Sequence, residues 1–462
     1  MIPDHDTIVA PATAAGGAIA VVRVSGREAF ALCDRVFRGR KPLAEADGYT
    51  VHYGEIMDGD RIVDDVLAAV FRAPHSYTGE DSVEISCHGS SYIVSEILRL
   101  LTAAGGRMAQ PGEFTIRAYL AGKLDLSQAE AVADTIAASS RAAHALASTQ
   151  MRGGYSDELE RLRDKLLNLT SLLELELDFS EEDVEFADRT ALRETMQRIG
   201  AEIDRLRSSF SLGNAIKEGV AVAIAGAPNV GKSTLLNRLL NEERAMVSEI
   251  AGTTRDTVEE KATVGGVLLR LIDTAGLHET DDLVEQLGVE RSKKAVEDAD
   301  LILALLDGST GLPASEALAA EMLAPLELAA KSGKPWLLLL TKSDLGRGTG
   351  VAPDEDWRAP EAVISLSSVT HEGFKALEAA IRTLYPAPKG DTSLVTNARQ
   401  ADAIRRALDS VRAAKDALQS GMTPDVVLTE VEQAENALGE LTGHTAREDM
   451  VARIFERFCV GK

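Results

Sequence analysis

The chain has 462 residues, a formal net charge of −24 and 45% hydrophobic residues. Its length accommodates about three domains, and the acidic balance excludes a protein that grips nucleic acid over a wide basic surface. Any RNA contact would therefore need a local basic patch or a partner subunit.

Cysteine usage and the lack of long apolar segments indicate the cytoplasm. The cysteines are Cys33, Cys87 and Cys459, an odd number without metal-ligand spacing, which argues against a disulfide framework and for a reducing compartment. The first residues do not have the pattern of a signal peptide. The sequence also lacks the run of about 18 apolar residues that a membrane span needs.

Residues 1–120 have the pattern of an α+β domain. Apolar runs predict strands at 18–24 and 65–71, and helical periodicity predicts a helix at 92–104. Gly105 and Gly106 then end that helix.

Residues 121–215 are predicted to form the first part of a helical domain. They include an Ala-rich stretch at 126–152 and leucines at helical spacing in 157–177. The acidic run 178–188 is interpreted as a solvated connection between helices, since nothing nearby supplies further metal ligands.

Residues 216–384 alternate strand and helix. Short apolar runs of this kind are typical of buried parallel strands with crossover helices, and they lie at 220–225, 267–273, 301–307, 336–341 and 362–366. Residues 385–462 return to helix at 398–419, 425–441 and 446–458. The simplest architecture is an α/β nucleotide-binding domain inserted into a discontinuous helical domain and preceded by the N-terminal α+β domain.

The segment Gly226-Ala-Pro-Asn-Val-Gly-Lys-Ser233 matches the phosphate-binding loop G-x-x-x-x-G-K-[ST] between a strand and a helix. Glycines let backbone N–H groups wrap phosphates at a helix N-terminus. Lys232 is expected to reach the β and γ phosphates, and Ser233 is expected to hold Mg²⁺.

Two further segments follow in the order that a nucleotide switch requires. Thr254, within residues 251–256, is the natural second protein ligand for Mg²⁺. Asp273 ends the next strand and can reach the magnesium shell, while Gly276 of the same Asp-x-x-Gly segment lets backbone approach the γ-phosphate.

Thr341-Lys-Ser-Asp344 resembles the guanine-reading N-K-x-D motif. Asp344 would accept two hydrogen bonds from guanine that adenine cannot supply, and the stem of Lys342 would cover the base. Thr341 replaces the Asn of the motif, which weakens one polar contact. Ser367 follows the last predicted strand and would complete the base pocket.

The sequence as a whole resembles one family of GTPases, the tRNA-modification GTPases MnmE or TrmE. The resemblance covers nearly the whole chain and is carried by segments that include DTIVAPAT (6–13), PGEFTIRAYLAGKLDLSQAEAVAD (111–134), GAPNVGKSTLLN (226–237), AGTTRD (251–256) and RIFERFCVGK (453–462). The Phe-Cys-x-Gly-Lys segment is the most specific of these.

This resemblance implies that an intrinsic K⁺ ion replaces an arginine finger. Its ligands fall on Asn229, Ser248, Ile250 and Thr253, and the glutamate that orients the attacking water falls on Glu285. The implied nucleotide contacts also include Val230, Gly231, Thr234, Thr274 and Ala275. The nucleotide domains are expected to dimerise during hydrolysis.

The resemblance also implies a folate site and partners. Arg23, Glu84, Lys123 and Lys462 match positions that contact 5-formyl-tetrahydrofolate, and Cys459 matches a cysteine considered catalytic. Taken one by one, the four charged residues are more typical of surface charges, whereas Cys459 is equally typical of a small buried hydrophobic residue. The implied assembly is a homodimer with an FAD-dependent partner of the MnmG (GidA) family, acting on tRNA.

Three functions remain open at this point. The first is a K⁺-dependent GTPase that drives modification of the tRNA wobble uridine at carbon 5. The second is a ribosome-assembly or signalling switch without modification chemistry, which would need neither the folate-like domain nor the Cys-x-Gly-Lys segment. The third, motivated by Thr341, is an ATPase.

Overall fold

The computed structural model describes residues 6–14, 16–178, 189–241, 260–272, 293–309, 316–346, 357–386, 394–456, 458 and 461. The contacts divide the chain into two compact units, one of residues 1–136, 149–204 and 402–462 and one of residues 137–148 and 205–401. The finer division at residues 120, 215 and 384 stays a prediction, because the contacts group the N-terminal sheet with the helices.

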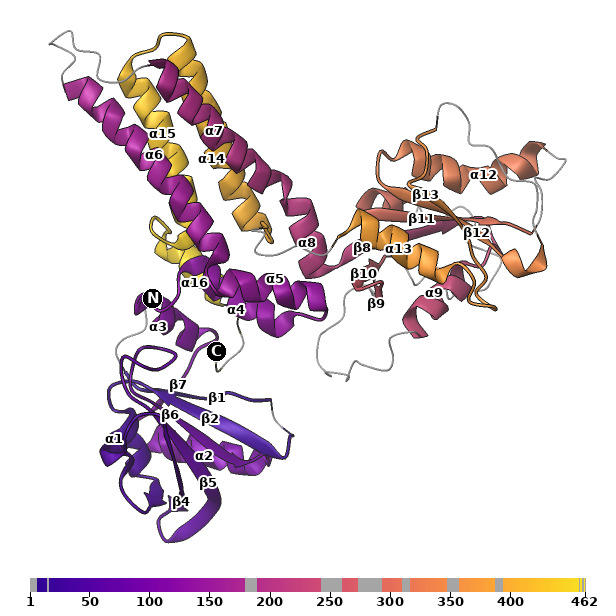
Figure 1. The fold of residues 1–462 in the computed structure, drawn as a ribbon. Coiled ribbons are helices and arrows are strands. Elements are labelled where there is room, and N and C mark those ends of the chain that lie inside the picture. Colours follow the sequence, from indigo (N-terminus) through magenta and orange to yellow (C-terminus); the bar gives the residue numbers. More distant parts are fainter. Residues whose placement is uncertain are drawn as a thin grey trace. The chain divides into compact units, whose positions relative to one another are not determined.

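The N-terminal part of the first unit is a mixed sheet (Figure 1). Its strands lie in the order β3-β4-β5-β6-β2-β1-β7 and are antiparallel except for the pair β1 and β7. They are β1 (Ile8–Pro11), β2 (Ile19–Ser25), β3 (Phe37–Gly39), β4 (Thr50–Asp58), β5 (Arg61–Phe71), β6 (Ser82–His88) and β7 (Arg107–Met108).

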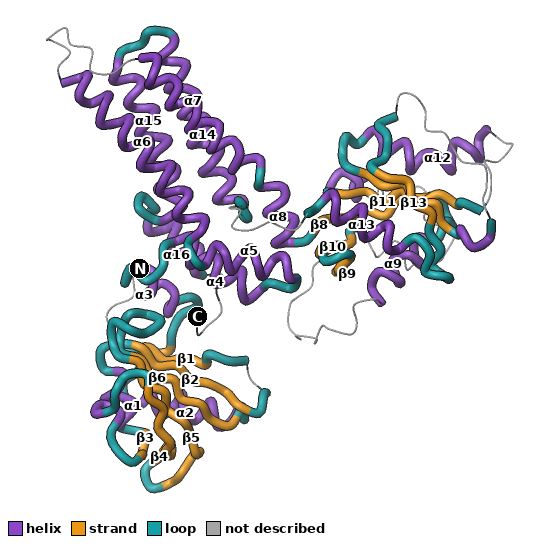
Figure 2. Tube along the Cα trace, viewed as in Figure 1, coloured by secondary structure: helices purple, strands orange, loops and turns teal. Residues whose placement is uncertain are grey.

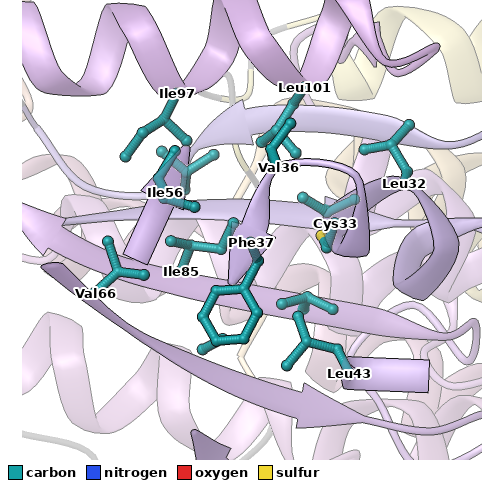
Figure 3. Packing of buried hydrophobic residues seen from close by; sticks show 14 of the residues in the cluster. Leu32, Cys33, Val36, Phe37, Leu43, Ile56, Val66, Ile85, Ile97 and Leu101 are labelled. Carbon is teal, nitrogen blue, oxygen red and sulfur yellow. The ribbon is translucent and has the colours of Figure 1, made fainter. Parts of the chain in front are cut away.

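One face of this sheet is covered by α1 (Ala29–Asp34), the short helix η1 (Leu43–Glu45) and α2 (Ser91–Ala103). Alternate residues of β5, such as Val66, Ala68 and Val70, are buried on that face. Figure 3 shows the packing, with Ile97 and Leu101 of α2 above Ile85 of β6. Within the sheet, β2 and β6 lie side by side.

The helical part of the first unit is built on four long helices that lie side by side (Figure 2). They are held by pairs such as Arg163–Glu435, Lys165–Glu202 and Arg406–Glu440. The long helices are α6 (Gly154–Asp178), α7 (Arg189–Ser208), α14 (Ala398–Gln419) and α15 (Pro424–Thr442). The predicted leucine periodicity is confirmed in α6, where Leu159, Leu162, Leu166, Leu169 and Leu173 are buried.

The shorter helices of the first unit are α3 (Glu113–Leu120), α4 (Leu126–Ala137) and α16 (Glu448–Phe455), whereas α5 (Arg141–Met151) lies mostly, and α8 (Phe210–Glu218) wholly, in the second unit. The Ala-rich stretch 126–152 forms two helices, because the Ser140 hydroxyl accepts a hydrogen bond from the Ala143 N–H and begins α5. Within the described ranges, no helix is both long and apolar enough to span a bilayer.

The second unit contains a six-stranded sheet in the order β13-β12-β11-β8-β10-β9. All neighbouring strands are parallel except β9 and β10, so the prediction of a mostly parallel sheet is confirmed. The strands are β8 (Val220–Gly226), β9 (Glu260–Val264), β10 (Val267–Leu271), β11 (Leu301–Asp307), β12 (Trp336–Thr341) and β13 (Ala362–Ser365).

Helices cover both faces of this sheet. Leu235 and Leu236 of α9 (Lys232–Asn241) and Leu377 of α13 (Phe374–Leu384) pack on one face. Leu326 of α12 (Glu316–Lys331) packs on the other, with Trp336 of β12. In such a doubly covered sheet, ligands bind at the carboxyl ends of the parallel strands.

Candidate nucleotide-binding site

The predicted phosphate loop runs from the end of β8 into the start of α9. Gly231 has φ 104° and Asn229 has φ 58°, so the chain turns twice through the left-handed region that favours glycine. At Gly226, a Cβ would lie 2.8 Å from Cγ1 of Val230 and 3.0 Å from the Leu305 carbonyl oxygen, so only glycine fits. The loop is therefore a tight backbone cradle at a helix N-terminus, as phosphate binding requires.

Lys232 closes this cradle. Its Nζ donates hydrogen bonds to the carbonyl oxygens of Gly226 (2.7 Å) and Ala227 (3.0 Å), and burial lowers its pKa. Both acceptors are uncharged, so they leave the ammonium charge for an anionic ligand. In the next positions, Ser233 is half-buried and Thr234 is exposed.

The predicted base-reading segment follows β12 in a short helix, η2 (Ser343–Leu345). Lys342 has φ 56°, and Asp344 in η2 is exposed. The Ser343 N–H donates to the Leu366 carbonyl (3.1 Å), which holds the segment against the end of β13. Ser343 Oγ is buried with no hydrogen-bond partner among the described residues.

Ser367 lies beside this segment. It is fully buried, and its Oγ accepts hydrogen bonds from the N–H groups of Val369 (3.3 Å) and Thr370 (3.1 Å). Because β12 and β13 are parallel neighbours, the loops carrying Asp344 and Ser367 start from one edge of the sheet. Ser367 thus shapes the loop on that edge, with its hydroxyl already engaged.

Thr341 connects the base-reading segment to the phosphate loop. Its buried Oγ1 lies 2.7 Å from the Val230 carbonyl oxygen of the phosphate loop and 3.2 Å from the Leu306 carbonyl oxygen. The residue that departs from the N-K-x-D motif therefore joins the base-reading strand to the phosphate loop.

Asp307, at the end of β11, lies outside the nucleotide-binding motifs that sequence spacing defines. Its Oδ2 lies 2.7 Å from Nζ of Lys342, and its Oδ1 accepts hydrogen bonds from the N–H (3.0 Å) and hydroxyl (2.6 Å) of Ser309. Burial acts to raise the pKa of Asp307, but the hydrogen bonds from Lys342 and Ser309 outweigh it and leave the pKa below its ordinary value. The available signal was an acidic residue ending an apolar strand.

The candidate folate residues lie in the first unit. Arg23 of β2 and Glu84 of β6 face each other in register and form an ion pair of 2.8 Å. The Arg23 guanidinium also lies over the rings of Tyr77 (5.4 Å) and Phe114 (5.6 Å). It donates to the Gly461 carbonyl (3.3 Å), next to Lys462 in sequence.

Lys123 is exposed, and a Cβ on Gly79 would lie 3.8 Å from its Cε. It therefore lies close to the loop that carries Tyr77. Several predicted site residues are outside the described residues, namely Ser248, Ile250, Thr253, Thr254, Asp273, Thr274, Ala275, Gly276, Glu285, Cys459 and Lys462.

The mostly parallel sheet, the phosphate loop closed by Lys232 and the Lys-x-Asp segment on the same sheet edge define a class of protein, the phosphate-loop GTPases. Two protein-family models also match this chain. Residues 7–123 match the family described as GTP-binding protein TrmE N-terminus, and residues 126–459 match the MnmE helical domain.

Full-length relatives carry the same description. The tRNA modification GTPase MnmE of Flavobacterium psychrophilum is 45% identical over 468 residues, covering 99% of each chain. That of Cytophaga hutchinsonii is 46% identical over 463 residues, covering 99% of this chain and 98% of the relative. The chain belongs to the MnmE family of tRNA modification GTPases, so the predicted family, fold class and GTP hydrolase activity are confirmed.

Among solved structures, the G domain of the FeoB iron transporter from T. maritima is 27% identical. The match covers 36% of this chain and 98% of the FeoB domain, with a TM-score of 0.23. That score is low, and family membership rests on the relatives and the family matches.

Proposed function

We propose that this GTPase drives a conformational cycle in the modification of the tRNA wobble uridine at carbon 5, by which a carboxymethylaminomethyl or aminomethyl group is added. One observation carries the proposal. A guanine-type site, with Lys232 in its phosphate loop and Asp344 after β12, lies within a chain similar over 99% of its length to tRNA modification GTPases. The ribosome-assembly or signalling alternative does not account for that full-length similarity.

Lys232 binds the β and γ phosphates in this account, and Asp344 and the stem of Lys342 bind the base. The Ser233 hydroxyl, with Thr254, would hold Mg²⁺, and Asn229, Ser248, Ile250 and Thr253 would hold K⁺. Hydroxyl, amide and carbonyl oxygens suit both ions, and Asn229 is exposed on its left-handed turn. Bound cations neutralise charge that develops in phosphoryl transfer.

Glu285 would orient the attacking water, a positioning role that Gln fills in other GTPases. The contacts of Val230, Gly231, Thr234, Asp273, Thr274, Ala275 and Gly276 with the nucleotide belong to the same proposal. Cys459 is retained as a candidate catalytic residue of the modification step.

The N-terminal sheet would bind 5-formyl-tetrahydrofolate as the one-carbon donor. Arg23, Lys123 and Lys462 suit the carboxylates of a folate, and Glu84 suits the donors of its pterin ring. The half-buried Tyr77 ring beside the Arg23 guanidinium would supply an apolar wall for a ring system, and the fully buried Phe114 supports it from the core. The charged side chains and the Tyr77 ring at this place support the proposal.

The proposed assembly is a cytoplasmic homodimer that works with an FAD-dependent MnmG-like subunit and tRNA. The net charge of −24 favours RNA binding through that partner or through a local basic patch.

Nucleoside analysis of tRNA tests this function directly. Cells lacking the chain should lose the modified wobble uridine, and expression of the intact chain should restore it. Glu285→Ala should bind GTP but fail to restore the nucleoside, because hydrolysis drives the cycle. Normal tRNA nucleosides together with defective ribosomal subunits would support the assembly alternative instead.

A further inference from the structure

The carboxyl ends of β11 and β12 lie close together. Asp307 and Thr341 are in register, and the Gly308 N–H donates to the Thr341 carbonyl (2.8 Å). A Cβ on Gly308 would lie 3.0 Å from that carbonyl oxygen, so glycine permits the close approach. Asp307 and Lys342 are thereby brought within reach of each other.

We propose that Asp307 is a positioning residue for nucleotide binding, which fixes the Lys342 side chain beside the guanine through their ion pair. This inference rests on the proposed guanine site and assigns a role to a residue outside the nucleotide-binding motifs. Both carboxylate oxygens are committed, Oδ2 to Lys342 and Oδ1 to Ser309. The Asp307 side chain is 17% exposed, so the contact is partly shielded from solvent.

The ion pair matters because the backbone of Lys342 is in the left-handed region, with φ 56°. This conformation is uncommon for a residue other than glycine, and it sets the direction in which the long side chain leaves the backbone. A lysine has four rotatable bonds, and ordering its side chain at the moment of binding costs conformational entropy. Asp307 holds the ammonium in place before the nucleotide arrives. The methylene stem can then cover the base without bringing an unpaired charge against it.

A double-mutant cycle in the full-length chain tests this role, with GDP and GTP affinity measured by calorimetry in Mg²⁺ and K⁺. Asp307→Asn should weaken both nucleotides by roughly threefold to thirtyfold, between the effects of a surface and a buried ion pair. In a Lys342→Met background, the same substitution should have no further effect, because Asp307 acts through Lys342. Ser309→Ala should give a smaller loss in the same direction.

Asp300 supplies a matched control, because it precedes β11 at the opposite end of the same strand. Its Oδ2 accepts a hydrogen bond from the Ala221 N–H (3.0 Å). Asp300→Asn should leave nucleotide affinity unchanged, even if thermal unfolding shows lower stability.

Two outcomes overturn the inference while leaving the proposed function intact. One is unchanged or tighter nucleotide binding by Asp307→Asn, and the other is an equal loss with and without Lys342. Failure of the intact chain to bind guanine nucleotides would instead contradict the proposed function itself. If Asp307→Asn does not fold, the milder Ser309→Ala must show the loss in the intact chain and none in the Lys342→Met background.

Discussion

The hydroxyl of Thr341 lies 2.7 Å from the backbone carbonyl oxygen of Val230, so the strand that leads to the base-reading segment is tied to the phosphate loop. Thr341 departs from the usual asparagine of the motif. Thr341 is 8% exposed and Val230 is 4% exposed, so this hydrogen bond is buried. This buried hydrogen bond therefore connects the end of β12 to the phosphate loop.

Removing this hydroxyl tests the coupling. Thr341→Val preserves side-chain shape but leaves the Val230 carbonyl without its donor, which costs about 1–3 kcal/mol when buried. We expect weaker binding of both GDP and GTP, measured by calorimetry, and we expect Thr341→Ser to restore it. Wild-type affinity in Thr341→Val would show that the hydrogen bond does not support the site.

Asp344 should determine which base is bound. A carboxylate accepts two hydrogen bonds from the N1–H and exocyclic amine of guanine, whereas an amide can donate to the 2-oxygen of xanthine. Asp344→Asn should therefore weaken GDP binding by roughly 100-fold or more and improve binding of xanthosine diphosphate. Competition between the two nucleotides measures this, and an unchanged preference would place the base elsewhere.

Turnover should depend on K⁺. Replacing K⁺ by Na⁺ should lower GTP hydrolysis by roughly 100-fold, the scale of losing one charge-stabilising group, while GDP affinity stays the same. Steady-state phosphate release measures turnover, and calorimetry in the same buffers measures binding. Equal turnover in the two salts would remove the K⁺ ligands from the account, beginning with Asn229.

Arg23 should be needed for folate. Arg23→Met keeps the bulk of the side chain but removes the cation, so affinity for 5-formyl-tetrahydrofolate should fall by roughly tenfold. Arg61→Met is a matched control, because Arg61 begins β5 of the same sheet and is 52% exposed. If both variants bind folate like the unmodified chain, the folate site is not at Arg23.

Much of the fold was predictable because its buried elements have distinctive patterns. The strands at 220–226, 301–307 and 336–341 are nearly continuous apolar runs, as expected for strands buried on both faces. β9 (Glu260–Val264) escaped prediction because it is a short edge strand with a charged beginning. The break between α4 and α5 was also missed, since serine caps are less conspicuous than glycine or proline.

The candidate site was predictable only where local spacing defines it. The phosphate loop is contiguous, so its glycines, Lys232 and Ser233 could be identified from sequence. Asp307 lies 35 residues before Lys342, and no local pattern indicates their pairing. The bond from Thr341 to Val230 spans 111 residues and likewise depends on strand order.

Equilibrium binding of GTP, GDP and ATP to the purified chain, with Mg²⁺ and K⁺ present, tests whether the chain carries a guanine-specific site. Both guanine nucleotides should bind, and ATP should bind at least about 100-fold more weakly, because adenine lacks the donors that Asp344 accepts. Absence of guanine nucleotide binding, or equal affinity for ATP, would contradict a guanine-specific site.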